Sequence, residues 1–210
     1  MLLRQSRKGP EVLMGRRHGR AKFLPDIYVF PGGRVEPDDR TPTGFRERLE
    51  PQFLQGLRRG GLRTDPTALL RAAIRETYEE TGLMLAAGLE DEPAEPTGVW
   101  RDFHGRGLRP RFEEIGFVAR AITPRGSHRR FNTRFFLADG SYAAGELTGD
   151  GELEDLAWRP AADMVRFNLV DVTEFVLAEA LTVWRDGNIW RDRPPPLFSY
   201  VGESARIRRD

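Results

Sequence analysis

Residues 65 to 83 read DPTALLRAAIRETYEETGL and carry the strongest local structural signal in the chain. Asp65 is a residue type that caps helix N-termini, and Pro66 suits the first helical position. Gly82 suits the left-handed residue that commonly follows the last turn. Apolar residues recur at helical spacing between these signals. The sequence therefore predicts a helix from about Pro66 to Thr81.

Glu76, Glu79 and Glu80 crowd the last two turns of this helix and share one sector of its surface. Each acid meets the negative end of the helix dipole, which is unfavourable by about 0.3–1 kcal/mol, and like charges one turn apart add roughly 0.2–0.5 kcal/mol per pair. A divalent cation would relieve both effects, and carboxylate oxygens suit Mg²⁺ or Mn²⁺. The alternative is an ordinary solvated helix face, partly neutralised by Arg71 and Arg75.

Two adjacent glycines, Gly32 and Gly33, follow a short run that reads as a strand, Ile27–Phe30. Backbone without side chains can approach a phosphate closely or offer a carbonyl oxygen to a metal. This context favours the metal-site interpretation of the glutamates.

The rest of the chain alternates strand-like and helical patterns, which favours an α/β or α+β layered fold with mixed strand pairing. Further strands are expected at Glu11–Met14, Phe112–Ile122, Phe131–Leu137 and around Leu156–Trp158, and helices at Pro160–Met164 and Val172–Trp184. Residues 40–64 are punctuated by proline and glycine and predict a small helical excursion, whereas residues 191–210 predict an extended tail. At 210 residues, we expect a single domain over residues 1–210.

Composition excludes several classes of protein. The 33 basic and 32 acidic residues nearly cancel, so the charge does not indicate a nucleic-acid partner. The absence of cysteine excludes disulfides and thiolate chemistry. No apolar stretch reaches the length of a membrane helix or a signal peptide. We therefore expect a cytoplasmic protein without a membrane partner, and a homodimer remains open.

The motif resembles the box of the nudix hydrolases, G-x5-E-x7-R-E-U-x-E-E-x-G-U, where U is aliphatic. Its second half is matched by Arg75-Glu76, Glu79-Glu80 and Gly82-Leu83, and its opening glycine by Gly33. Asp39 stands where the family has glutamate, and Thr77 replaces an aliphatic residue. The 35 residues from Arg40 to Ile74 replace the seven of the family. Because the excursion ends before Asp65, we expect it to loop out without moving either half.

The resemblance implies a nudix-like α/β/α sandwich with a mixed sheet, and hydrolysis of a nucleoside diphosphate linked to another group, with Mg²⁺ or Mn²⁺. By carry-over, Glu79 and Glu80 would be metal ligands, and Glu76 either a ligand or the base that accepts a proton from water. The Gly32 carbonyl would add a backbone ligand. Arg75 would orient the glutamates by pairing with Asp39 or Glu36.

An interrupted box is similar to one branch of the family, which includes peroxisomal diphosphatases of coenzyme A and acyl-coenzyme A. The likeness extends to Glu11–Met14 with Arg16-Arg17, to Phe30–Gly33, and to Arg129-Arg130-Phe131, and so covers most of residues 11–160. It implies a substrate of the coenzyme A type. The alternatives are an ADP-ribose or dinucleotide pyrophosphatase and, from another class, a nudix-fold sensor that binds nucleotide without cleaving it.

Further candidates come from loops and strand ends. Gly33, Arg16, Arg17 and Arg130 are candidate contacts to substrate phosphates, although a chain so rich in arginine also produces such clusters by chance. Glu152 and Glu154 are candidates for one more acid of the site.

Overall fold

The computed structural model describes residues 1–21, 24–58, 62, 64–124, 126–127, 130–187, 194–202 and 204–209. The chain forms two compact units. The first consists of Met1–Ile115 with Ala138–Asn168, and the second of Gly116–Leu137 with Leu169–Asp210. The single domain expected over residues 1–210 stays a prediction.

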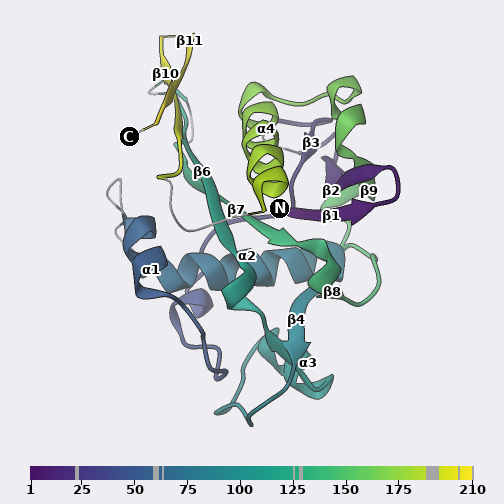
Figure 1. Ribbon diagram of the computed structural model, residues 1–210, viewed down its shortest axis with the longest axis vertical. Helices are drawn as coiled ribbons and strands as arrows, with labels where there is room; N and C mark the ends of the chain where they lie inside the picture. The colour runs from purple at the N-terminus through teal and green to yellow at the C-terminus, as the bar shows by residue number, and fades with distance from the viewer. Residues whose placement is uncertain are drawn as a thin grey trace. The chain divides into compact units, whose positions relative to one another are not determined.

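The first unit contains a mixed sheet built around β2 (Gly9–Arg17) (Figure 1). This strand pairs antiparallel with β1 (Leu2–Ser6), β3 (Tyr28–Val29) and β9 (Leu153–Pro160). The last residues of β7 (Asn132–Asp139) pair parallel with β1. Leu3, Val12, Leu13 and Met14 are fully buried, so the apolar stretch of β2 forms part of the core of this unit.

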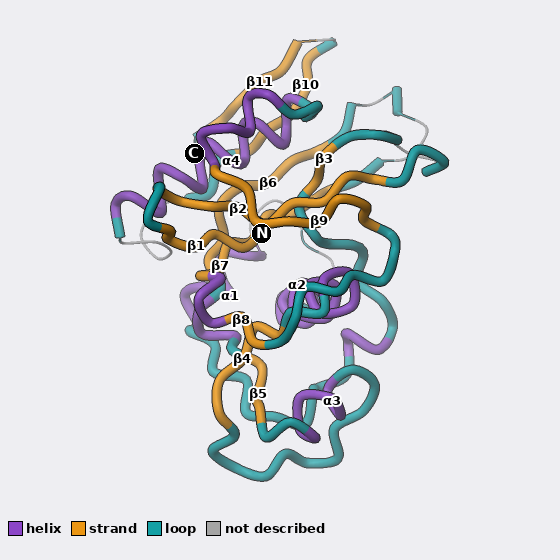
Figure 2. Tube along the Cα trace, turned by 90° about the vertical axis from the view of Figure 1, so that its right-hand side faces the viewer, coloured by secondary structure: helices purple, strands orange, loops and turns teal. Residues whose placement is uncertain are grey.

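Helix α2 (Pro66–Thr81) is the longest helix of the first unit. It lies between the mixed sheet and a smaller antiparallel sheet, as both Figure 1 and Figure 2 show. The smaller sheet consists of β4 (Met84–Gly88), β5 (Leu108–Pro110) and β8 (Ala143–Ala144). Helices α1 (Pro51–Arg58) and α3 (Trp100–Gly105) belong to the same unit, together with four 3-10 turns, Asp38–Arg40, Phe112–Glu114, Gly140–Tyr142 and Ala161–Arg166.

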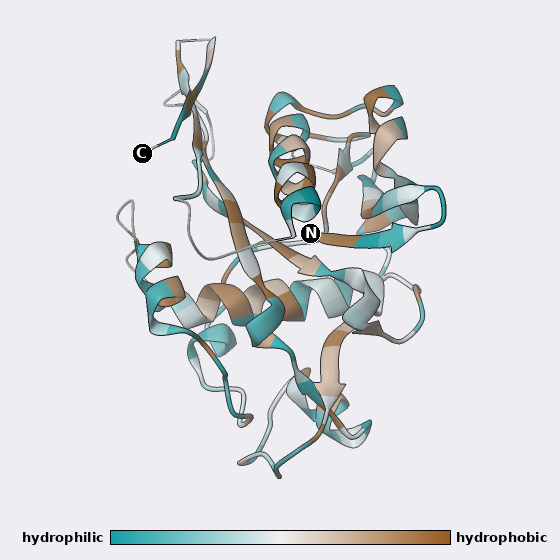
Figure 3. Ribbon diagram, viewed as in Figure 1, coloured by the Kyte–Doolittle hydropathy of each residue, from teal (hydrophilic) through white to brown (hydrophobic). Residues whose placement is uncertain are grey.

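In its described residues, the second unit combines one helix with strands that pair both parallel and antiparallel. Strand β6 (Gly116–Ile122) pairs antiparallel with β7 and parallel with β10 (Leu197–Val201), and β10 pairs antiparallel with β11 (Ser204–Arg208). Helix α4 (Asp171–Asp186) packs against β6. Hydrophobic residues alternate with hydrophilic ones along α2 and α4, as expected of helices with one buried face (Figure 3).

The tail predicted as extended over residues 191–210 is more regular than expected, because its described residues form the β10–β11 hairpin. Phe198 packs on Phe175 of α4 with ring centroids 5.2 Å apart. The Tyr200 hydroxyl donates to Asp171 at 2.6 Å, and Arg209 donates to Glu179 at 2.9 Å. The tail is therefore an integral part of the second unit.

Most of the predicted elements are found. Helix α2 has the predicted bounds, and α1 confirms the helical part of the inserted segment. One expectation needs correction, because Phe112–Glu114 is a 3-10 turn before β6 rather than strand. Leu2–Ser6 forms a strand that was not expected. None of the helices in the described part of the chain combines the length and apolar character of a membrane span.

Candidate active site

The ends of α2 place the glutamates in its last two turns. The Asp65 carboxylate accepts a hydrogen bond from the Thr67 backbone N–H at 3.1 Å, which caps the first turn. Gly82 follows the last turn with φ of +74°, and its N–H donates to the Tyr78 carbonyl at 2.7 Å. Because a left-handed glycine ends the helix there, Glu79 and Glu80 stand at its C-terminus as expected.

Arg75 is the centre of the acidic cluster and is only 8% exposed. Its Nε and Nη2 atoms each donate to one oxygen of Asp39 at 2.9 Å. The same guanidinium lies 2.6 Å from Glu79 and 3.0 Å from Glu76. Among the described residues, the Glu36 carboxylate forms no ion pair with Arg75, although its charge helps to raise the pKa of Glu76, and its backbone N–H donates to Asp39 at 2.7 Å. Of the two acids left open by the sequence, Asp39 is therefore the partner of Arg75.

These contacts keep Arg75 charged. Burial alone would lower the pKa of this guanidinium, but the hydrogen bonds with Asp39 and Glu79 and the charge of Glu76 outweigh it and raise the pKa. Arg75 thus links the acid upstream of the insertion to two glutamates of α2.

The two glycines after β3 lie against the other side of the cluster. The Gly32 N–H donates to Glu80 Oε2 at 2.8 Å. A Cβ added to Gly33 would lie 2.3 Å from Glu76 Oε1, which no side chain could occupy without displacing that carboxylate. The two halves of the interrupted motif therefore meet in space. The structure shows the N–H of Gly32 facing a glutamate, while the expected role of its carbonyl remains a prediction.

Glu80 is 6% exposed and has the most strongly shifted carboxylate of the cluster. Burial raises its pKa to about 8, the Gly32 hydrogen bond opposes this rise, and the charges of Glu76, Glu152 and Asp150 add to it. Glu152 and Asp150 belong to a loop whose Thr148 N–H donates to the Thr81 carbonyl at 3.1 Å. The structure thus brings the charge of the predicted Glu152 close enough to act on Glu80.

Asp150 was missed by the sequence analysis, and the only local signal was its position between two glycines, Gly149 and Gly151. Its carboxylate accepts the Glu152 N–H at 2.9 Å, which shapes the turn.

The other two glutamates differ in exposure. Glu76 is mostly buried, and burial raises its pKa although Arg75 acts in the opposite sense. The side chain of Glu79 is 40% exposed and bonds to Arg75. Glu76 and Glu79 therefore share one buried arginine, Arg75, whereas Glu80 forms no ion pair with it among the described contacts.

The candidate phosphate-binding arginines lie in different places. Arg16, on β2, contacts Glu154 at 2.7 Å and Asp26 at 3.3 Å, so Glu154 is an ion-pair partner of Arg16. Arg17 is half-buried and its backbone N–H bonds to the Ile27 carbonyl. Arg130 is exposed in the second unit. Their roles toward substrate stay predictions.

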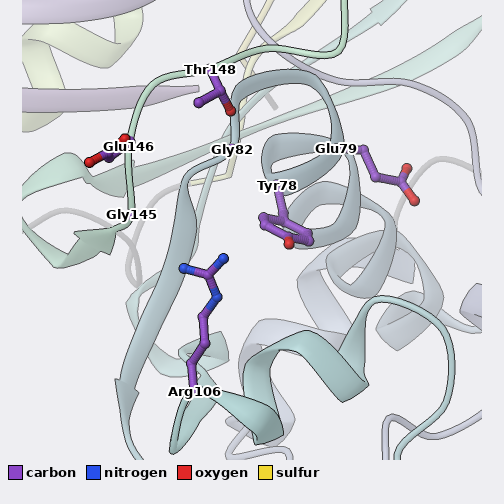
Figure 4. Close-up of a pocket in the computed structure, with 7 residues that line it drawn as sticks. All are labelled: Tyr78, Glu79, Gly82, Arg106, Gly145, Glu146 and Thr148. Atoms are coloured by element: carbon purple, nitrogen blue, oxygen red, sulfur yellow. The ribbon is translucent and has the colours of Figure 1, made fainter.

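A cavity of about 510 Å³ adjoins the C-terminal end of α2 (Figure 4). Its lining consists of Tyr78, Glu79, Gly82, Arg106, Gly145, Glu146 and Thr148. In Figure 4 the exposed side chain of Arg106 extends toward the loop that carries Gly145, and the Glu79 carboxylate points away from Arg106. Arg106 had no sequence signal, because it follows α3 and reaches this place only through the fold.

The residues of the cluster fit a divalent cation by their chemistry. Glu80 is a hard oxygen donor buried among other acids, and among the described residues no arginine or lysine forms an ion pair with it. As they stand, no three acids or histidines of the described chain are arranged to hold a metal ion. Glu76 and Glu79 instead turn to Arg75. Binding would thus require their carboxylates to reorient.

No family model matches the chain. Its structure superimposes on that of a NUDIX hydrolase from Alicyclobacillus acidocaldarius with a TM-score of 0.61 and 29% identity, covering 86% of this chain and 87% of the other. The chain belongs to the nudix hydrolase family.

A curated nudix relative, acyl-coenzyme A diphosphatase NUDT19 of Xenopus laevis, is 24% identical over 237 residues, which cover 90% of this chain. The chain spans 58% of the length of that relative. The expected nudix-like fold of mixed α/β type is confirmed. Thr77, which replaces an aliphatic residue of the nudix box, is buried, and its hydroxyl donates to the Ala73 carbonyl at 2.7 Å. This bond satisfies the hydroxyl, so threonine fits the aliphatic position.

Proposed function

We propose that this nudix protein is a magnesium-dependent diphosphatase that hydrolyses the diphosphate linkage of a nucleoside diphosphate derivative. The observation that carries the proposal is the meeting of Gly32 and Gly33 with Glu80 and Glu76 across the inserted segment. A strand end without side chains thereby faces buried carboxylates, which is the combination that metal-assisted phosphoryl chemistry needs.

In this proposal Glu76, Glu79, Glu80 and the Gly32 carbonyl would hold Mg²⁺ or Mn²⁺. When bound, the ion would neutralise charge on the diphosphate and activate water. Arg75 orients Glu76 and Glu79 while it is itself fixed by Asp39. Glu76 serves either as a ligand or as the base that accepts the proton of the attacking water, and its raised pKa suits a proton acceptor.

Gly33 lets the Glu76 carboxylate lie directly against the main chain, because any side chain there would displace it. Gly33 is also proposed to contact a substrate phosphate through its backbone. Arg16, Arg17 and Arg130 are proposed to contact substrate phosphates. Arg16 is already held by Glu154 and Asp26, so a phosphate would have to compete with two carboxylates for it.

We propose coenzyme A or an acyl-coenzyme A as the substrate. Support comes from the similarity to the Xenopus acyl-coenzyme A diphosphatase and from the insertion inside the nudix box. ADP-ribose and dinucleotides are the alternatives with the same chemistry. We further propose a cytoplasmic protein with neither a nucleic-acid nor a membrane partner, and homodimer formation stays a prediction.

The test is a screen of metal-free protein with coenzyme A, acyl-coenzyme A, ADP-ribose and a dinucleotide, with and without added Mg²⁺ or Mn²⁺. Hydrolysis in ¹⁸O-labelled water identifies the phosphorus atom that is attacked. Glu80→Gln, which preserves size and removes the charge, should abolish metal-dependent turnover and leave the fold intact. Calorimetric binding of a nucleotide without turnover under any of these conditions would instead indicate a sensor.

A further inference from the structure

We propose that Glu47, which lies in the segment inserted into the nudix box, is a positioning residue for the catalytic helix and acts through Arg71. The inference rests on the proposed function, since it concerns the geometry of the same glutamates. It assigns to the insertion a part in forming the site.

Glu47 and Arg71 form a two-point ion pair between the insertion and α2. Arg71 Nε donates to Glu47 Oε1 at 2.7 Å, and Arg71 Nη2 donates to Glu47 Oε2 at 2.7 Å. Arg71 is 4% exposed, and the Glu47 side chain is 13% exposed. A buried fork of this kind fixes both distance and orientation, which a single contact with a lysine would not.

The third nitrogen of the Arg71 guanidinium contacts Asp39, the acid that pairs with Arg75. Arg71 Nη1 donates to the backbone carbonyl of Asp39 at 3.0 Å. The carboxylate of the same Asp39 takes both hydrogen bonds from Arg75, which in turn contacts Glu76. Arg71 and Arg75 stand one helical turn apart on α2. The first therefore binds the main-chain carbonyl of Asp39 and the second binds its carboxylate.

The insertion is folded so as to present Glu47 to the helix. The backbone N–H and the hydroxyl of Thr43 both donate to Glu47 Oε1, at 3.3 and 3.2 Å. Thr43 and Phe45 are buried, and the Phe45 N–H bonds to the Thr43 hydroxyl. The first part of the insertion is therefore anchored beside α2. The two halves of the motif still meet, as expected, but the insertion also contacts the helix itself.

Removal of Glu47 would leave the buried guanidinium of Arg71 with only a weaker partner in place of this carboxylate. In the part of the chain that the structure describes, the other carboxylate within ion-pair distance of Arg71 is the half-exposed Asp65, whose Oδ2 lies 3.9 Å from Arg71 Nη1. That is the same nitrogen that holds the Asp39 carbonyl. Without Glu47, we therefore expect Arg71 to shift and Asp39 to lose its main-chain anchor, which loosens the Asp39–Arg75 pair.

The experiment compares Glu47→Ala and Glu47→Gln with Glu50→Gln, an exposed acid of the same segment. Hydrolysis of the best substrate from the screen should show kcat lowered about ten-fold in Glu47→Ala, as expected for a small misplacement of reacting groups. KM should change by less than about two-fold, since Glu47 is not expected to touch the substrate. Glu50→Gln should match the unmodified protein.

A double-mutant cycle tests the route. If Glu47 acts through Asp39, adding Glu47→Ala to Asp39→Asn should lower kcat by less than about a further two-fold. Additive losses would overturn the proposal, as would an unchanged kcat accompanied by a lower unfolding temperature, which would show a merely structural role. If Glu47→Ala does not fold, Glu47→Gln carries the same comparison with a smaller expected loss.

Calorimetric titration with Mg²⁺ alone gives a readout that needs no turnover. Glu47→Ala should weaken Mg²⁺ binding several-fold, and Glu50→Gln should leave it unchanged. If the unmodified protein binds Mg²⁺ but hydrolyses nothing, the proposed function fails while the role of Glu47 is still decided by this titration. Equal Mg²⁺ affinity in Glu47→Ala and Glu50→Gln would overturn the proposal.

Discussion

Asp39 and Arg75 form a two-point ion pair, with both nitrogen–oxygen distances at 2.9 Å, although the 35 residues from Arg40 to Ile74 separate them along the chain. Asp39 is 1% exposed, so water does little to screen this pair. The pair joins the two ends of the inserted segment. Together with the Gly32–Glu80 hydrogen bond, it brings the two halves of the interrupted nudix box together in space.

Breaking this pair should destabilise the fold as well as the site. Asp39→Ala leaves Arg75 buried with Glu76, Glu79 and the Arg34 carbonyl as its remaining partners, and we expect a loss of about 3 kcal/mol in unfolding free energy. Urea denaturation measures the loss. Glu36→Gln keeps the backbone N–H that Asp39 accepts, and it should change stability by less than about 0.5 kcal/mol. Equal losses in the two variants would contradict the assigned pairing.

Gly33→Ala should impair catalysis more than folding. The new Cβ would lie 2.3 Å from Glu76 Oε1 and displace that carboxylate, whose side chain can move. We expect turnover to fall at least ten-fold or so with a change in unfolding temperature of only a few degrees. Gly105→Ala is the control, because nothing lies within 4 Å of its Cβ position. An active Gly33→Ala enzyme would show that Glu76 is not confined by this glycine.

Gly82→Ala combines two separable effects. Gly82 has φ of +74°, a conformation that costs alanine roughly 1 kcal/mol. Its Cβ would also lie 2.6 Å from the Glu146 carbonyl oxygen, which belongs to the backbone. Gly107 has a similar φ of +68° but open space around it. Gly107→Ala should therefore show the backbone effect alone, and Gly82→Ala a loss about twice as large or more in denaturant titrations.

The raised pKa of Glu80 predicts a pH dependence of the metal-free protein. Folding moves this pKa from 4.5 to about 8, so between these values the folded state holds a proton that the unfolded state releases. The contribution of Glu80 to stability should fall as pH rises through this window, by on the order of 1 kcal/mol per pH unit, and level off above pH 8. It is the difference between the slopes of the unmodified protein and Glu80→Gln. Urea titrations at several pH values in the presence of a chelator measure both slopes. An unchanged slope in the variant would exclude Glu80 as a source of the pH dependence.

Helix α2 could be predicted to its bounds because its start and end depend on local residues, Asp65, Pro66 and Gly82. The meeting of Gly33 with Glu76 followed from the motif, which fixes their relation whatever lies between them.

The sequence could not predict contacts between segments that no shared motif relates to each other. The Glu47–Arg71 pair joins residues 24 positions apart, and the sequence assigned Arg71 only to partial neutralisation of a helix face. The position of Asp150 near Glu80 depends on a loop anchored by Thr148, and that of Arg106 on the packing of α3. Such positions are decided by tertiary packing, which overrides local propensity.

The anchoring of Glu47 beside α2 also bears on how proteins of this architecture could diverge. The entropy of closing a loop grows only slowly with its length, by roughly 0.6 kcal/mol per doubling. Residues 48–64 lie between two fixed points, Glu47 and the start of the helix, so additions that spare the buried Leu57 would leave the chemical groups where they are. A lineage could thus lengthen this stretch without rebuilding the reaction centre.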